Sequence, residues 1–144
     1  MRKFLPLFVI FVALLVGILF LKASKQNTSD QTVVDNRIIV TLAEQNSSGQ
    51  NGSVTIVPTD DTLSITVEVN SINAFTQPAH IHSGTCNKPG PVVVALPFPV
   101  NGFAEGEVGT TLDQLKAQLP LIINIHKSEK EANIYTACGE LQIR

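Results

Sequence analysis

The amino-acid sequence predicts an all-β domain: a Greek-key β-sandwich or barrel of about eight strands with one short crossover helix. Three observations support this fold class. Apolar and polar residues alternate over short segments, clusters of turn-forming residues separate these segments roughly every 8–12 residues, and a single segment has a helical pattern. The 144 residues suffice for one domain of ordinary size, and an apolar segment precedes it.

The apolar N-terminal segment predicts a transmembrane or signal helix. The run from Phe4 to Leu21 is uncharged and follows Arg2 and Lys3, and as a helix it would span roughly 27 Å, just short of a bilayer core. Residues 21–23 (LKA) match a signal-peptide cleavage site poorly, because such a site requires small residues. The run therefore favours an uncleaved signal anchor over a cleaved signal peptide. In either case we expect the rest of the chain to lie outside the cytoplasm.

Composition sets the expected domain boundaries. Residues 1–25 form the anchor or signal peptide, residues 26–36 a polar linker without periodicity, and residues 37–144 the β domain. Residues 26–144 contain twelve acidic and six basic side chains, a formal charge of −6. This charge argues against nucleic-acid binding, which requires clustered Lys and Arg, and it would not steer a small anion toward the protein.

The strands differ in how clearly they alternate. The first three alternate well and are typical of an antiparallel meander with one buried face, whereas the fifth is continuously apolar, which predicts a central strand. The crossover helix is expected at residues 110–119, where a threonine caps its start and Pro120 stops it. The predicted strands cover residues 38–43, 54–58, 63–70, 79–82, 91–96, 103–109, 121–126 and 134–143.

All histidines and cysteines lie in two short segments, one with His80, His82 and Cys86 and one with His126 and Cys138. Because side chains alternate along a strand, His80 and His82 project from one face, roughly 6.6 Å apart. If His126 comes from a neighbouring strand, the three imidazoles form a site that suits copper or zinc, with a fourth position left to water or substrate. The alternative is that the histidines occupy solvent-facing positions and bind nothing.

The two cysteines of an exported chain are most simply explained by a disulfide. A bond between Cys86 and Cys138 would close a loop of about 53 residues and contribute about 4 kcal/mol on the chain-entropy model. It would also pin the loop after His82 to the last strand. Free thiols, or a sulfur ligand to the metal, are the alternatives.

Three separated motifs resemble those of copper–zinc superoxide dismutases. Residues 80–86 (HIHSGTC) are similar to the copper-loop motif of that family, residues 123–127 (INIHK) to its second copper segment, and residues 137–141 (ACGEL) to its C-terminal strand, which carries the second disulfide cysteine. The order of the strands is also similar. The resemblance implies a Greek-key β-barrel with His80, His82 and His126 as copper ligands and an intrachain Cys86–Cys138 disulfide.

The sequence departs from that family at the zinc site. The dismutases have a long loop with a bridging histidine and further zinc ligands, whereas here the chain has no other histidine and a strand follows Cys86 within a few residues. Tyr135 stands where the family has an arginine beside the copper. The compact pattern, with GPVVVAL at residues 90–96 and GFAEG at residues 102–106, resembles CHRD (chordin-type) domains, which share this fold and imply no catalytic role.

The function expected from these observations is a binding module: an exported, membrane-anchored domain that binds one copper ion through three histidines, with zinc as the less favoured metal. A metal-free structural or adhesive CHRD module is the alternative. A copper-only superoxide dismutase is less favoured, because the residues for anion guidance and proton supply are missing. We assign no catalytic residue, and we place Glu105 and Glu107 at solvent-facing positions rather than in an acid–base pair. The expected partners are a metal ion and the membrane.

Overall fold

The computed structural model describes residues 36–70 and 74–143. The anchor expected at residues 1–25 and nearly all of the linker expected at residues 26–36 lie outside the described residues. Among the residues described, no helix combines the length and apolar character needed to cross a membrane.

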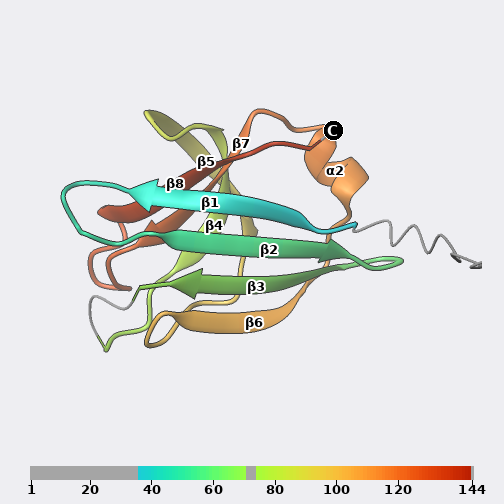
Figure 1. The fold of residues 1–144 in the computed structure, drawn as a ribbon. Helices are drawn as coiled ribbons and strands as arrows, with labels where there is room; N and C mark the ends of the chain where they lie inside the picture. Colours follow the sequence, from blue (N-terminus) through green and yellow to red (C-terminus); the bar gives the residue numbers. More distant parts are fainter. Residues whose placement is uncertain (1–35, 71–73, 144) are drawn as a thin grey trace, which may run out of the picture. The chain divides into compact units, whose positions relative to one another are not determined.

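Eight antiparallel strands form one sheet that curls into a half-barrel (Figure 1), in the order β5-β4-β7-β8-β1-β2-β3-β6. This confirms the predicted all-β class with about eight strands and one short helix. The connections β3–β4, β5–β6 and β6–β7 cross between the two halves of the sheet, as in Greek-key folds. The strands are β1 (Ile38–Glu44), β2 (Gly52–Pro58), β3 (Leu63–Val69), β4 (Ala79–Thr85), β5 (Lys88–Ala95), β6 (Phe103–Val108), β7 (Leu121–His126) and β8 (Tyr135–Leu141).

The predicted meander of β1, β2 and β3 is confirmed. Their registers place Val40 opposite Val54 and Val54 opposite Val67, so that one row of valines crosses all three strands. All three side chains are buried, and the alternate residues of these strands face outward. Such cross-strand rows of β-branched residues stabilise a sheet and fix its register.

The prediction that the fifth strand is central was wrong, because β5 lies at an edge of the sheet. Its side chains are largely accessible, and Val92 is 52% exposed. A continuously apolar run is compatible with a doubly buried strand, but β5 also contains Pro89 and Pro91. Proline has no backbone N–H to donate to a neighbouring strand. Prolines are therefore found in edge strands, at the first residue of a strand or at bulges, and not within central strands.

The predicted crossover helix is present but shorter than expected. Helix α2 (Leu112–Lys116) connects β6 to β7 along the chain, and these two strands belong to opposite halves of the sheet. A capping box starts it: the backbone N–H of Gln114 donates to Thr111 Oγ1, and the Gln114 side chain accepts from the Thr111 N–H. Leu115 is fully buried and anchors the helix to the core.

The hydrophobic core lies on the inner face of the curled sheet. Both halves contribute, with Ile56 and Ile65 from the meander and Ile81, Ile123 and Ile125 from β4 and β7, all fully buried. In β4 and β7, the residues that alternate with these isoleucines point to the opposite, outer face of the sheet. That outer face carries the histidines.

A disulfide joins Cys86 to Cys138, as predicted, with Cα atoms 5.9 Å apart. Cys86 lies in the turn between β4 and β5, and Cys138 lies in the middle of β8. In β8, Ala137 belongs to the core, so the neighbouring Cys138 points to the outer face. The bond therefore holds the β4–β5 turn over the outer face of the sheet and excludes both thiols as metal ligands.

We predict that the double variant C86A/C138A loses about 2–4 kcal/mol in free energy of unfolding, because a link over 52 residues no longer restricts the unfolded chain. Denaturant unfolding of the oxidised full-length protein and of the variant measures this difference. A variant as stable as the parent would show that the turn is held in place without the disulfide.

Candidate metal centre

The pairing of β4 with β7 brings the three histidines together. His80 and His82 lie on β4, and His126 is the last residue of β7. The two strands are antiparallel neighbours, and the His126 backbone N–H donates to the Pro78 carbonyl just before β4. The structure thus joins the two segments that contain the predicted ligands.

The nitrogen atoms of the three rings converge. His80 Nδ1 lies 3.0 Å from His126 Nε2, and His82 Nε2 lies 3.4 Å from the same atom. One ring nitrogen from each histidine lies within 4.8 Å of the other two. His82 and His126 are each 4% exposed, so the alternative of solvent-facing histidines does not hold for them. His80 is partly exposed.

These separations fit the ligands of one metal ion. With metal–nitrogen bonds of about 2.0–2.1 Å, two ligand nitrogens lie about 2.9 Å apart at a right angle and about 3.3 Å apart at a tetrahedral angle. The distances from His126 Nε2 to the other two rings, 3.0 and 3.4 Å, are of this size. The donor set would contain three imidazoles and no carboxylate.

Backbone carbonyls fix the protonation pattern of two rings. His82 Nδ1 lies 2.9 Å from the Gly90 carbonyl oxygen, and His126 Nδ1 contacts the Ala132 carbonyl oxygen. A carbonyl oxygen only accepts hydrogen bonds, so both Nδ1 atoms carry the proton and donate. In the neutral rings both Nε2 atoms therefore present lone pairs, and these face each other across 3.4 Å. A cation between them removes the repulsion.

His80 has the opposite orientation. Its Nδ1 faces His126 Nε2, which accepts, so His80 Nδ1 donates when no metal is bound. A metal ion at the centre requires the His80 proton to reside on Nε2 instead. The ligand atoms are then Nδ1 of His80 and Nε2 of His82 and His126.

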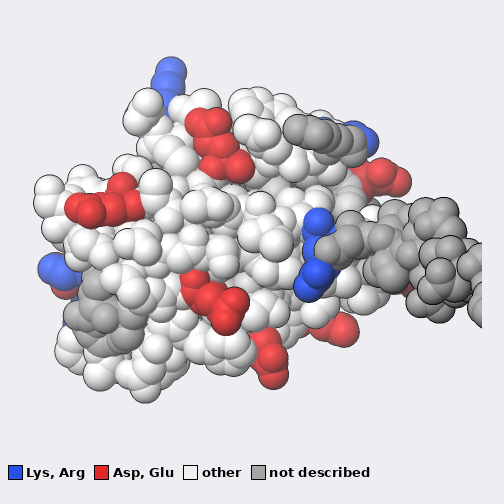
Figure 2. Space-filling model, in the orientation of Figure 1, with Lys and Arg blue, Asp and Glu red and all other residues white. Residues whose placement is uncertain are grey.

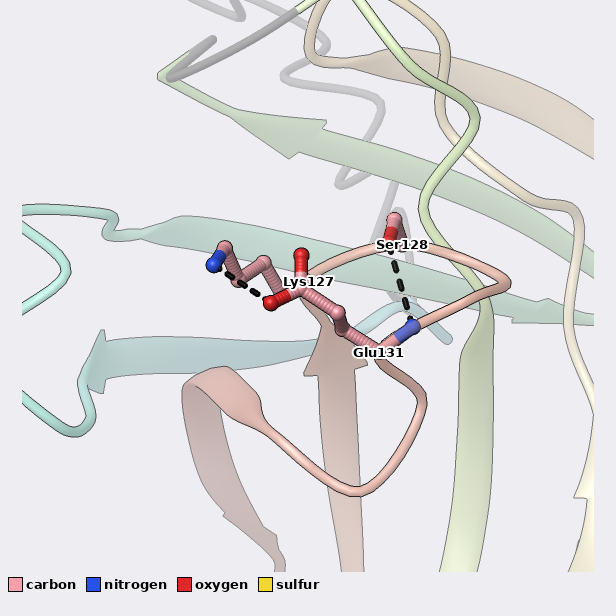
Figure 3. Close-up of polar contacts among 3 residues, drawn as sticks. All are labelled: Lys127, Ser128 and Glu131. Carbon is pink, nitrogen blue, oxygen red and sulfur yellow. Dashed lines mark hydrogen bonds and ion pairs between the residues drawn. The ribbon is translucent and has the colours of Figure 1, made fainter.

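The loop after β7 holds the Ala132 carbonyl against His126. In this loop, Lys127 Nζ pairs with Glu131 Oε1 at 2.7 Å, and the Glu131 backbone N–H donates to Ser128 Oγ at 3.2 Å (Figure 3). The Lys127 N–H donates to the Ile134 carbonyl and closes the base of the loop. Because both members of the ion pair are more than two-fifths exposed, the pair itself contributes little stability. The backbone bonds define the shape of the loop.

A buried amide pair supports the backbone of His126. The side chains of Gln50 and Gln77 exchange two hydrogen bonds of 2.8 and 2.9 Å, and Gln77 Nε2 also donates to the His126 carbonyl at 3.0 Å. Thr136 Oγ1 donates to the Ile125 carbonyl. Gln50 precedes β2 and Gln77 precedes β4, so this network links the meander to the histidine-bearing half of the sheet.

Aromatic rings flank the histidines. The Phe98 ring packs edge-on against His80 at a centroid distance of 5.5 Å. The Tyr135 ring lies 4.9 Å from His126 and 5.9 Å from His82. Tyr135 therefore lies beside the candidate centre and presents a phenol ring to it.

Burial favours the neutral, metal-binding form of the His80 and His126 imidazoles by lowering the pKa of each ring. Desolvation, followed by the neighbouring charges of His126 and His82, lowers the pKa of His80 from 6.5 to about 4. Desolvation also lowers the pKa of His126, although its bond to the Ala132 carbonyl acts in the opposite direction. A neutral imidazole is the form that binds a metal ion.

Figure 2 shows how the charged side chains are distributed over one face of the molecule. Acidic residues are spread over it, and the basic residues visible there do not gather into a patch. Glu105 and Glu107 both point to solvent from the edge strand β6, as expected.

Sequence reasoning missed several groups around the histidines. The Gly90 and Ala132 carbonyls leave no sequence signal, because any residue supplies a backbone oxygen. The Gln50–Gln77 pair forms between distant loops. Asn124 had a visible signal, since it is a polar residue within an apolar strand in which all six residues are buried.

The fold and the site define a small all-β domain in which three histidines from two neighbouring strands can hold a metal ion. The family model described as the CHRD domain matches residues 26–133, three quarters of the chain and all three histidines. The protein therefore belongs to the CHRD domain family. No curated protein and no solved structure matches the chain.

We predict that the His80 ring of the metal-free protein titrates near pH 4 in an NMR titration with a chelator present. Between pH 6.5 and about 4 the unfolded chain then binds more protons at this residue than the folded chain does. The free energy of unfolding should accordingly fall as the pH drops through this window.

The variant H80Q is the control, because it cannot titrate at this position. Its free energy of unfolding should depend less on pH between 6.5 and 4 than that of the parent. A His80 ring that titrates at pH 6.5 or above would contradict the burial described here.

Proposed function

We propose that this CHRD domain is an exported module that binds one copper ion through His80, His82 and His126. The module serves to hold copper, as in storage, delivery or buffering, outside the cytoplasm. The apolar N-terminal segment, residues 4–21, holds it at the membrane.

The observation that supports this function most strongly is the convergence of two fixed lone pairs. The carbonyls of Gly90 and Ala132 hold the Nδ1 protons of His82 and His126, so both Nε2 atoms are available as ligands at a separation of 3.4 Å. Hydrogen bonds from the ring nitrogen that does not bind the metal orient imidazoles in metal sites and raise their basicity. Both rings are almost completely buried, which limits the access of bulk water to these two nitrogen atoms.

The donor set supports copper as the metal. Imidazole suits copper and zinc, whereas magnesium, calcium and manganese prefer oxygen ligands, and divalent copper exceeds zinc in intrinsic affinity for such sites. Both cysteines are in the disulfide, so thiolate coordination is excluded. The resemblance of the three histidine positions to the copper ligands of copper–zinc superoxide dismutases also supports copper.

The disulfide and the N-terminal sequence support export. Disulfides persist in oxidising compartments outside the cytoplasm, and the Cys86–Cys138 bond lies in the part of the chain that binds the metal. The uncharged run from Phe4 to Leu21 follows two basic residues, as in a signal anchor. Together these features favour a domain tethered to the outer surface of a membrane.

Two competing functions have less support. A metal-free structural module gives no role to the convergence of three histidine ring nitrogens within 4.8 Å of one another, two of them from buried residues. A copper-dependent superoxide dismutase would need a cationic group to guide the anion, and Tyr135 occupies the corresponding position. We therefore restrict the proposal to metal binding.

We predict that the untagged, oxidised full-length protein in detergent binds one equivalent of Cu(II) tightly. The variant H126A should weaken binding on the order of 100-fold or more, because His126 Nε2 is adjacent to both other ligand atoms. Titration in competition with a chelator of known affinity measures the dissociation constant and the stoichiometry.

The matched control is E105Q/E107Q, which removes two exposed carboxylates from β6, a strand that pairs with β3 and not with β4 or β7. This variant should bind copper as the parent does. Binding that is lost in E105Q/E107Q but retained in H126A would mean that copper attaches to surface carboxylates, and the proposed function would be wrong.

A further inference from the structure

Asn124 carries the one buried side-chain amide without a partner among the described residues. Neither its Nδ2 nor its Oδ1 has a hydrogen bond, and the residue is 1% exposed. By contrast, the buried amides of Gln50 and Gln77 are bonded to each other. Native structures almost always satisfy buried polar groups, so an unpaired amide indicates that a binding partner belongs beside it.

Strand register places this amide beneath the three rings. Asn124 of β7 lies directly opposite His80 of β4, and directly opposite residues on one face have Cβ atoms about 4.5–5.5 Å apart. On its other side, Asn124 lies opposite Cys138 of β8, whose disulfide covers this part of the face. Asn124 therefore shares the outer, histidine-bearing face and not the core.

The rings of His82 and His126 meet over this position. His82 pairs with Ile122, two residues before Asn124, and His126 follows Asn124 by two residues. Although His82 and His126 are far apart along the strand pair, their Nε2 atoms lie only 3.4 Å apart. The two rings must therefore lean toward each other above the His80–Asn124 pair, which leaves the Asn124 amide at the buried side of the candidate centre.

We propose that Asn124 Oδ1 is the fourth donor to the metal ion, and that this oxygen makes the centre selective for Cu(II) over Cu(I). The inference rests on the proposed function. Three imidazoles leave one position open, and a set of three nitrogens and one oxygen suits Cu(II), whereas Cu(I) prefers soft ligands. Ligation of the metal would also give a partner to Asn124 Oδ1, one of the two side-chain atoms that the protein leaves unpaired.

The test compares N124L with the parent and with N124D, all as untagged full-length protein with copper as the only added metal. Leucine has a similar size and removes the oxygen, whereas aspartate retains an oxygen donor. N124L should bind Cu(II) about 10-fold to 100-fold more weakly and leave Cu(I) affinity nearly unchanged. N124D should retain Cu(II) binding, and the metal-free N124L should be at least as stable as the parent, because the unpaired amide is gone.

A second measurement needs no variant. In the parent labelled with ¹³C at the asparagine side-chain amide, Cu(II) should show a hyperfine coupling to one amide carbon. N124L with the parent's Cu(II) affinity and electron paramagnetic resonance spectrum would overturn the inference, as would equal weakening of Cu(I) and Cu(II) or the absence of a coupling in the parent. Failure of the parent to bind copper at all would instead refute the proposed function, and the inference with it.

Discussion

The antiparallel pairing of β4 with β7 is the constraint on which the candidate centre depends. It places His80 opposite Asn124, holds the His126 backbone beside the start of β4, and turns Ile81, Ile123 and Ile125 into the core. A slip of one residue would exchange the two faces and bury the histidines among isoleucines. The buried isoleucines thus determine the register of β4 against β7, and this register determines where the histidine side chains lie.

Elements on both sides of this strand pair hold the rings in place. The disulfide keeps the β4–β5 turn over the outer face, and β5, which follows that turn, supplies the Gly90 carbonyl that orients His82. On the other side, the loop closed by the backbone hydrogen bond from Lys127 to Ile134 supplies the carbonyl that orients His126. The site is therefore preorganised by backbone groups, and its side chains need little rearrangement to receive an ion.

Most of the fold could be predicted from the sequence, because period-two alternation and turn residues are local signals. The edge position of β5 could not, since apolar content alone does not distinguish an edge from a centre, although Pro89 and Pro91 indicated the answer. The three histidines could be named from spacing and resemblance, but their convergence depends on topology. The carbonyls of Gly90 and Ala132 emerge only from the packed structure, as does the lack of a partner for the amide of Asn124, although a polar residue in this apolar strand was visible in the sequence.

X-ray absorption of the copper-loaded full-length protein tests the central claim most directly, because it reports the atoms bound to the ion. The account predicts nitrogen or oxygen ligands at about 2.0 Å with the multiple-scattering pattern of three imidazoles, and no sulfur. That pattern should lose one imidazole in H126A. A spectrum without imidazole scattering, or with sulfur at about 2.3 Å, would contradict a centre built from His80, His82 and His126.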